Sequence, residues 1–248
     1  MPTAAAGKAI DLLERTGLYR PVRRLAIPSI IYASRARDRV TRHSQHAIDR
    51  YLRTHDVPKV QLGCGMNYLN DWLNTDLVPN ANRVGLDVTR LFPLPDNSFD
   101  FIFSEHVIEH LPYAAGQVML AECQRVLKPG GVLRIATPDL RFVIGLYQHP
   151  DGAMQSAYVE WSSNEFIGKK APHDAVSVVN NYVRDWGHQY IYDVASMTKA
   201  MESAGLTGVV EASINQSQHP ALRDLENESR QPAGFLKLES MLLEARKP

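Results

Sequence analysis

The sequence predicts an α/β fold organised around an open, mostly parallel β-sheet. Short apolar segments of strand length recur between residues 59 and 137, and most of them end in an acidic or polar residue. A Gly-x-Gly turn follows the first segment, and a helical pattern precedes the last. Strands of a parallel sheet are buried on both faces, and ligands of open α/β sheets bind outside the carboxyl ends of the strands. The polar residues at the segment ends are therefore expected to form a ligand site.

Residues 1–58 are expected to form a helical, basic extension of a main domain over residues 59–248. Helices are predicted for Ala4–Thr16 and for Arg35–Thr54, where apolar residues recur at helical spacing. These residues are Val40, Ala47, Ile48 and Tyr51. Residues 1–59 hold 12 Lys and Arg against 5 Asp and Glu, whereas the rest of the chain is acidic. The two predicted helices either pack on the core with a solvated basic face, or form a lid over the ligand site or a docking surface for nucleic acid or a membrane.

Five strands are predicted before residue 138. They are Lys59–Leu62, Trp72–Leu77, Val84–Val88, Phe99–Ser104 and Val132–Thr137. Asp76 stands 11 positions after Gly65, and Asp87 stands 11 positions after Asp76. A complete crossover between parallel strands usually needs about a dozen residues or more. The first two crossovers are therefore predicted to be turns or loops.

A helix is predicted between the fourth and fifth strands, over Ala114–Lys128. Its apolar residues share one face, and Pro129-Gly130-Gly131 is expected to end it. Further along the chain, Asp193 is a predicted N-cap for a helix over Val194–Ala204, which Gly205 would end. Strands over residues 209–214 and 238–245 follow and would complete a sheet of seven strands.

The turn Gly63-Cys64-Gly65 indicates a ligand that the backbone approaches closely. A dinucleotide site would have a third glycine at position 68, so that a helix could present its N-terminus to a pyrophosphate, but this position is Tyr68. A ligand with a ribose and no phosphate fits better, because a carboxylate at the next strand end would accept hydrogen bonds from its hydroxyls.

Five motifs follow one another in a fixed order between residues 63 and 131. They are Gly63-Cys64-Gly65, the strand with Asp87, Leu94–Asp100, Ser104–Leu111 and Arg125–Gly131. This series resembles that of class I S-adenosylmethionine (SAM)-dependent methyltransferases of the type 11 group. The resemblance covers about residues 59–140 and implies a Rossmann-like, seven-stranded, mostly parallel sheet with helices on both faces and an antiparallel last strand.

The resemblance also implies SAM as the cofactor and a set of residues that bind it. The matched positions are Gly63, Cys64 and Gly65 in the turn, Asp76 at the ribose, Asp87 and Val88 at the adenine edge, and Glu105 and His106 at the methionine end. A turn or capping role for Asp76 stays open. His106 and His110 have the spacing of a zinc pair on a helix, but the His-Glu-x-x-His order of metalloproteases is absent.

Residues 141–192 are expected to form an insertion on the substrate side of the sheet. They hold 9 of the 20 aromatic residues. Rings with polar tips can build a substrate pocket, and the same rings can form the core of a small cap. The residues predicted to contact the substrate are Tyr113, His173, Asp174 and Trp186.

Methyl transfer to a hydroxyl needs a group that removes the proton, and histidine is the favoured general base near neutral pH. His188 is predicted to be this base. Asp139, at the end of the fifth strand, is predicted to orient that histidine, to bind substrate hydroxyls or to hold Mg²⁺, and the sequence leaves base and metal open. Methylation of nucleobase amines is disfavoured, because Ser104-Glu105-His106-Val107 replaces the Asn/Asp-Pro-Pro-aromatic motif of such enzymes.

The composition is that of one globular domain with additions, since 44% of the 248 residues are hydrophobic and 22% are charged. Two cysteines and the lack of a signal-peptide pattern or an apolar span of bilayer length favour a cytoplasmic protein, although peripheral membrane contact stays open. The predicted function is SAM-dependent O-methylation of a sugar or oligosaccharide, as in bacterial polysaccharide methyltransferases that act on mycobacterial methylmannose chains, which the chain resembles in general. An RNA methyltransferase using the basic segment, and a SAM-binding protein without turnover, are the alternatives.

Overall fold

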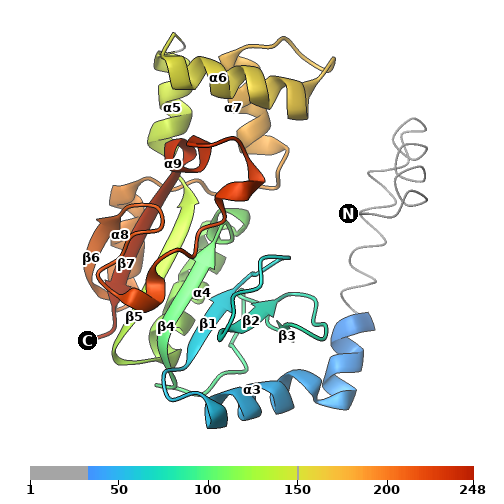
Figure 1. Ribbon diagram of the computed structural model, residues 1–248, viewed down its shortest axis with the longest axis vertical. Helices are drawn as coiled ribbons and strands as arrows, with labels where there is room; N and C mark the ends of the chain where they lie inside the picture. The colour runs from blue at the N-terminus through green and yellow to red at the C-terminus, as the bar shows by residue number, and fades with distance from the viewer. Residues whose placement is uncertain (1–32, 150) are drawn as a thin grey trace.

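The computed structural model describes residues 33–149 and 151–248, and a seven-stranded sheet forms its centre (Figure 1). The strand order is β3-β2-β1-β4-β5-β7-β6. The strands are β1 Lys59–Leu62, β2 Leu73–Asp76, β3 Val84–Gly85, β4 Phe99–Glu105, β5 Leu127–Pro138, β6 Thr207–Ala212 and β7 Ser240–Arg246. Strands β1 to β5 pair in parallel, and β7 is antiparallel to β5 and β6. The predicted fold class is confirmed.

The first two crossovers contain no helix, as their length predicts. The segments 63–72 and 77–83 consist of turns and bends with a single bridge. The Cys64 amide donates to the Thr75 carbonyl at 2.9 Å, and the Leu86 amide donates to the Asp76 carbonyl at 2.9 Å. Direct backbone bonds therefore hold the carboxyl ends of β1, β2 and β3 together.

The predicted end of the helix before β5 is wrong, because long-range pairing decides it. The helix α4 covers Tyr113–Val126, and the following Lys-Pro-Gly-Gly segment already lies in β5. Leu127 pairs with Phe99, and the Lys247 amide donates to the Gly131 carbonyl at 3.0 Å. These partners extend the sheet through the glycines.

The elements near the C-terminus follow the prediction closely. Helix α8 covers Val194–Ser203, and Asp193 caps it in a capping box with Ser196. Gly205 follows it with φ +86°. Strand β7 begins two residues later than predicted, because Phe235–Glu239 forms the short helix α9.

The two faces of the sheet have separate apolar layers. On β4, Ile102 packs with α4 and α8, whereas its neighbours Phe101 and Phe103 point to the other face. There they meet Leu222 in the short helix η3, Pro220–Leu222. The loop between β6 and β7 therefore covers the centre of this second face, while helices cover the first.

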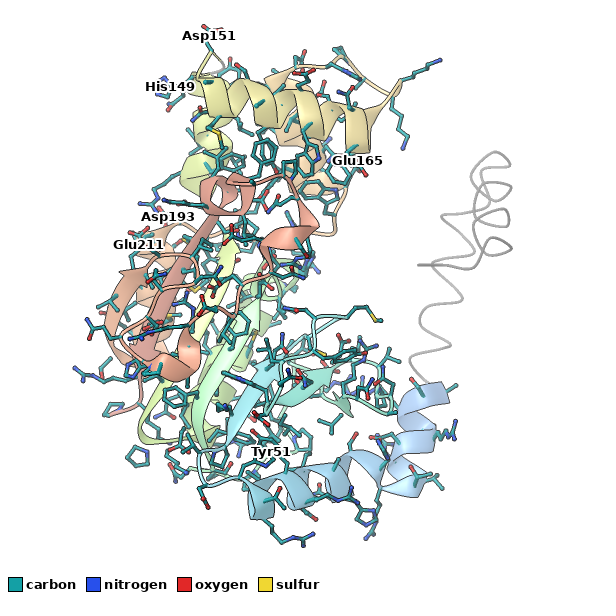
Figure 2. All side chains as sticks on the ribbon, in the orientation of Figure 1. Tyr51, His149, Asp151, Glu165, Asp193 and Glu211 are labelled. Atoms are coloured by element: carbon teal, nitrogen blue, oxygen red, sulfur yellow. The ribbon has the colours of Figure 1, made fainter. Side chains whose placement is uncertain are left out.

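The predicted helix over Arg35–Thr54 is two helices. Residues 33–41 are helical, Arg42 has a left-handed φ of +51°, and α3 covers His43–Thr54. α3 lies below β1, β2 and β3 in Figure 1, where Tyr51 donates a hydrogen bond to the Asp71 carbonyl (Figure 2). Val40 is 85% exposed, so it does not belong to the buried face. The helix predicted over Ala4–Thr16 lies outside the described residues.

A helical cap stands beyond the carboxyl ends of β4 and β5, at the top of Figure 1. It consists of α5 Leu140–Gln148, α6 Ala153–Ser162, the π-helix η2 Ser163–Ile167 and α7 Ala175–Arg184, with α9 packed on it. Tyr158 and Tyr182 are fully buried in its own apolar cluster. Aromatic rings from residues 141–192 thus build a small core, whereas Tyr192 packs in the main core and Tyr147 is exposed. Among the described residues, no helix is long and apolar enough to cross a membrane.

Candidate functional site

The glycine turn after β1 has the backbone shape that the sequence predicts. Gly63 and Gly65 have φ of +64° and +55°, which side chains of L-residues rarely allow. A Cβ on Gly63 would lie 2.4 Å from Val107 Cγ2, whereas a Cβ on Gly65 would meet no atom within 4 Å. Gly63 therefore allows close packing against Val107 of the Ser104–Leu111 motif, and Gly65 faces open space. Cys64 is buried between them.

Asp76, at the end of β2, closes this turn. Its carboxylate accepts a hydrogen bond from the Gly65 amide at 2.9 Å. Arg83 lies 3.5 Å from the same carboxylate and also donates to the Gly65 carbonyl. Asp76 thus joins the two strand ends, and it combines the position expected of a ribose-binding acid with the turn role that the sequence left open.

Asp87 follows β3 and is held by three neighbours. Its Oδ1 accepts from the Thr89 amide at 3.1 Å and from the Thr89 hydroxyl at 2.7 Å. Its Oδ2 lies 3.0 Å from Arg35 and 3.3 Å from Arg90. Burial alone would raise the pKa of Asp87, but Thr89 and Arg35 outweigh it and lower that pKa. Val88, beside it, packs on the main core.

Glu105 and His106 end β4 and are tied to the C-terminal segment. Buried Glu105 accepts from the Asn227 amide at 3.0 Å and pairs with Arg230 at 2.9 Å. His106 has φ +52°, and its Nε2 lies 3.0 Å from the Ser240 hydroxyl. Segments more than a hundred residues away in sequence therefore fix these two side chains.

A cavity of about 250 Å³, here called the histidine cavity, lies between the carboxyl ends of β4 and β5 and the helical cap. It is lined by His106, Glu109, His110, Pro138, Trp161, Phe166, Tyr182, Trp186, His188, Arg230, Gln231, Leu236 and Glu239. Trp186 and His188, both predicted site residues, are among them. The lining combines aromatic walls with imidazoles and carboxylates, which is a surface suited to a ligand that has apolar faces and many hydroxyls.

Glu109, in the short helix η1 (Ile108–His110), is one of two buried acids that line this cavity, the other being Glu239, and it was not among the predicted site residues. It is 0% exposed. Its Oε2 accepts from the Thr137 hydroxyl at 3.1 Å, and its Oε1 lies 3.2 Å from His106 Nδ1 and 3.8 Å from His110 Nε2. Burial alone would raise the pKa of Glu109, but the two histidines outweigh it and lower that pKa. Burial alone would lower the pKa of His106, but the interaction with Glu109 outweighs burial, and the pKa of His106 is raised.

His188 reaches the cavity from the loop between α7 and α8. Gly187, before it, has φ +81°. The His188 ring lies 5.0 Å from that of His110 and 5.2 Å from that of Tyr182, measured between centroids. Its Nδ1 is buried and has no hydrogen-bond partner in the described part of the chain. Burial lowers the pKa of His188, which favours the neutral imidazole that a proton acceptor requires.

Asp139, predicted to orient His188, to bind substrate hydroxyls or to hold Mg²⁺, is not among the residues that line the histidine cavity. It is the N-cap of α5, where its carboxylate accepts from the Arg141 amide at 2.8 Å and the Arg141 guanidinium at 2.7 Å. The same holds for Asp174, which caps α7. Its neighbour His173 lies 2.7 Å from the Gly168 carbonyl, and both line a different cavity.

Tyr113, predicted to contact the substrate, is also absent from the lining of the histidine cavity. Its ring packs on Tyr190 and Tyr192 at centroid distances of 5.0 and 6.3 Å. Tyr192 is fully buried, so this group of rings fixes the loop that leads from His188 to α8.

Residues 60–135 match the family described as Methyltransferase domain. A Mycolicibacterium smegmatis chain named "Probable S-adenosylmethionine-dependent methyltransferase" is 51% identical over a part that covers 32% of this chain and 37% of the relative. The chain thus matches about a third of that relative's length. The segment from β1 to β5 is therefore similar to methyltransferase domains.

Solved structures of SAM-dependent methyltransferases are also similar. One from Mesorhizobium loti is 15% identical, with a TM-score of 0.46, over 80% of this chain and 96% of its own. One from Archaeoglobus fulgidus is 15% identical, with a TM-score of 0.44, over 82% and 92%. At these identities and scores, the likeness carries no information about the acceptor.

Proposed function

We propose that the chain is a SAM-dependent O-methyltransferase that acts on a hydroxyl of a sugar or oligosaccharide, for example a mannoside of a polysaccharide pathway. The observation that carries this proposal is the lining of the histidine cavity. Trp161 and Trp186 offer flat faces to a sugar ring, and Glu239 and His188 offer partners to its hydroxyls. His106, which the resemblance assigns to the methionine end of the cofactor, is one of the residues that line this cavity.

The chain's residues fit the cofactor at the other strand ends. Open space in front of Gly65 leaves room for a ligand against the backbone. Asp76 and Asp87 present carboxylates at the ends of β2 and β3, where hydroxyls of a ribose and the edge of an adenine would bind. Arg35 holds Asp87 in the described structure, so this side chain has to share or release the carboxylate when a ligand binds.

When bound, SAM supplies a methyl group on a positively charged sulfur. The acceptor oxygen would take this methyl group, the cofactor would leave as its demethylated product, and His188 would accept the hydroxyl proton. The neutral imidazole of His188 can accept this proton, and the negative charge of nearby Glu109 stabilises the imidazolium that results. The cavity walls hold the hydroxyl in place, which supports the transfer through proximity.

The residues present do not fit Mg²⁺ as the activator. Mg²⁺ prefers oxygen ligands in octahedral geometry. Asp139, the acid expected to hold it, is engaged by Arg141. Of the two acids that line the cavity, Glu109 faces the imidazoles of His106 and His110, and Glu239 accepts hydrogen bonds from Tyr158 and Gln231. No step of the proposed reaction therefore passes through Mg²⁺.

A reducing compartment such as the cytoplasm fits the proposal. The two cysteines, Cys64 and Cys123, are free and buried. Burial raises the pKa of the Cys64 thiol to about 11, so this thiol next to the cofactor turn stays protonated and unreactive.

The experiment that tests the function is a methyl-transfer screen with labelled SAM over sugars, oligosaccharides, lipids and structured RNA. Label is expected in the hydroxyl-rich acceptors. Label found only in RNA, with a steep loss of affinity as salt rises, would favour the alternative that uses the basic N-terminal segment. If calorimetry detects neither SAM nor its demethylated product bound to the intact chain, the proposal is wrong as a whole.

A further inference from the structure

We infer that Glu109, His110 and His188 form a binding site for a divalent ion of the zinc type inside the histidine cavity. The inference goes beyond the proposed function, because it concerns a ligand that methyl transfer does not require. One donor atom from each of the three side chains is available, and these atoms all lie within 4.8 Å of one another. Two imidazoles and one carboxylate are the protein ligands of a known class of zinc sites that keep a fourth position open.

The distances require only small side-chain movements. Zn–N and Zn–O bonds of about 2.0–2.2 Å place tetrahedral ligands roughly 3.4 Å apart. Glu109 Oε1 and His110 Nε2 are already 3.8 Å apart. The His110 side chain is 40% exposed, so its ring has room to rotate toward the shared point.

The backbone fixes the two segments that supply the ligands. The Gln189 amide donates to the Glu109 carbonyl at 2.7 Å, and the Gln189 side chain donates to the His110 carbonyl at 2.9 Å. Residue 188 is therefore held beside residues 109 and 110. The Thr137 hydroxyl orients the other oxygen of Glu109, as partners behind the ligands do in metal sites.

His188 Nδ1 is buried without a hydrogen-bond partner among the described residues, and Glu109 Oε1 faces only the imidazoles of His106 and His110, at 3.2 and 3.8 Å. Buried polar atoms without a partner are rare in folded proteins, and each calls for an explanation such as an ion. Glu109 is 0% exposed, so its carboxylate is held away from bulk solvent, where a positive partner is most needed. A cation coordinated by both side chains would satisfy them together.

The donor set also selects the ion. Imidazole suits Zn²⁺, Cu²⁺, Fe²⁺ and Ni²⁺, whereas Mg²⁺ and Ca²⁺ prefer sets made of oxygen. His106 Nδ1 competes for Glu109 Oε1 at 3.2 Å. Binding of the ion therefore competes with the contact between His106 and this oxygen.

Occupation of the site has a consequence that rests on the proposed function. A neutral imidazole has one lone pair in the ring plane, and a bound metal uses it. His188 then has no position left for the proton of the acceptor hydroxyl. Zinc is therefore expected to inhibit methyl transfer.

The test uses the full-length chain after removal of metal with a chelator. Titration with Zn²⁺ in a calorimeter should show one bound ion, and Co²⁺ should give the visible absorption of a tetrahedral site. His110→Ala and His188→Ala should each weaken Zn²⁺ binding by roughly 10- to 100-fold or more. His149→Ala is the control, since His149 is exposed at the far end of the helical cap (Figure 2). Unchanged Zn²⁺ affinity in both cavity variants, or no stoichiometric binding by the wild type, would overturn the inference.

The activity arm separates this inference from the proposed function. Zinc should lower the rate of methyl transfer by the wild-type chain and by His149→Ala. Measured against its own rate without zinc, His110→Ala should be inhibited less than these two chains. Stoichiometric zinc binding in a chain that methylates no acceptor would refute the function and leave the metal site in place. Zinc that raises the rate would refute the inhibitory role.

Discussion

The ion pair between Arg35 and Asp87 links the N-terminal helical segment to the proposed cofactor site, and it gives a quantitative prediction. Asp87 Oδ2 is bound by Arg35 at 3.0 Å, and the arginine side chain is 36% exposed. An ion pair this exposed contributes about 0.2–1 kcal/mol. If the ligand has to displace Arg35, Arg35→Ala should bind the demethylated product of SAM roughly 1.4- to 5-fold more tightly.

Asp87→Ala should have the opposite and larger effect. Each hydrogen bond to a charged group contributes about 1.5–3 kcal/mol, so the loss of one hydroxyl contact predicts roughly 10- to 150-fold weaker binding. In the double variant, the gain from Arg35→Ala should disappear, because there is no carboxylate left to release. The demethylated product is the better probe, since it lacks the sulfonium charge and does not respond directly to the removal of an arginine.

Calorimetry on the two single variants, the double variant and a control completes the cycle. Arg39→Ala is the control, because Arg39 is exposed in the same helical segment and should leave the affinity unchanged. Weaker binding by Arg35→Ala would refute the reasoning and would make Arg35 part of the binding site. Normal binding by Asp87→Ala would remove Asp87 from the cofactor site.

Three further predictions concern the base, the turn and the core. His188→Ala should lower kcat by roughly 10²- to 10⁴-fold with nearly unchanged SAM affinity, as loss of a general base does; a near-normal kcat in single-turnover assays would exclude His188 as the base. Gly63→Ala should destabilise the fold by about 1–3 kcal/mol in urea unfolding, because its Cβ would lie 2.4 Å from Val107 Cγ2 at φ +64°. Adding Val107→Ala to this variant should restore the part of the stability that the clash removes. A double variant that is no more stable than Gly63→Ala would show that the whole cost lies in the backbone conformation. Arg134→Met should cost about 3–5 kcal/mol, since it leaves buried Glu226 and Glu244 without their partner; a variant as stable as the wild type would show that these acids take up protons readily.

Elements that depend on local patterns could be predicted from the sequence. The strands from β1 to β4 follow from short apolar runs, and α8 follows from Asp193 and Gly205 at its ends. The start of β5 could not be predicted, because Lys128–Gly131 has the composition of a helix stop and becomes a strand only through its partners Asp100 and Lys247. The five-residue helix α9 is too short to leave a periodic pattern.

The acidic residues of the candidate site also differ in whether the local sequence could predict their role. Asp139 was predicted to act in the site because it ends the fifth strand, and Asp174 because it forms a polar pair with His173 in the aromatic insertion. Each of the two acids directly precedes a helix, where Asp is a preferred N-cap. That local cue could have identified their role. Glu109 offers no such cue, because its burial depends on Thr137 and on the loop of Gln189, which lie 28 and 80 positions further along the chain.

Glu109 also explains why the cavity concentrates its chemistry at one point. A fully buried carboxylate needs positive partners or donors, and Thr137, His106 and His110 supply them in this chain. His188 lies close enough to feel the negative charge of Glu109. Burial lowers the pKa of His188, and the charge of Glu109 opposes this by stabilising the imidazolium form. Removal of the charge should therefore affect two groups at once: in Glu109→Gln, His106 loses the partner that raises its pKa, and His188 loses the charge that stabilises its imidazolium. A variant that still folds should lose kcat with little change in SAM affinity, whereas an intact kcat would show that the carboxylate serves the fold alone.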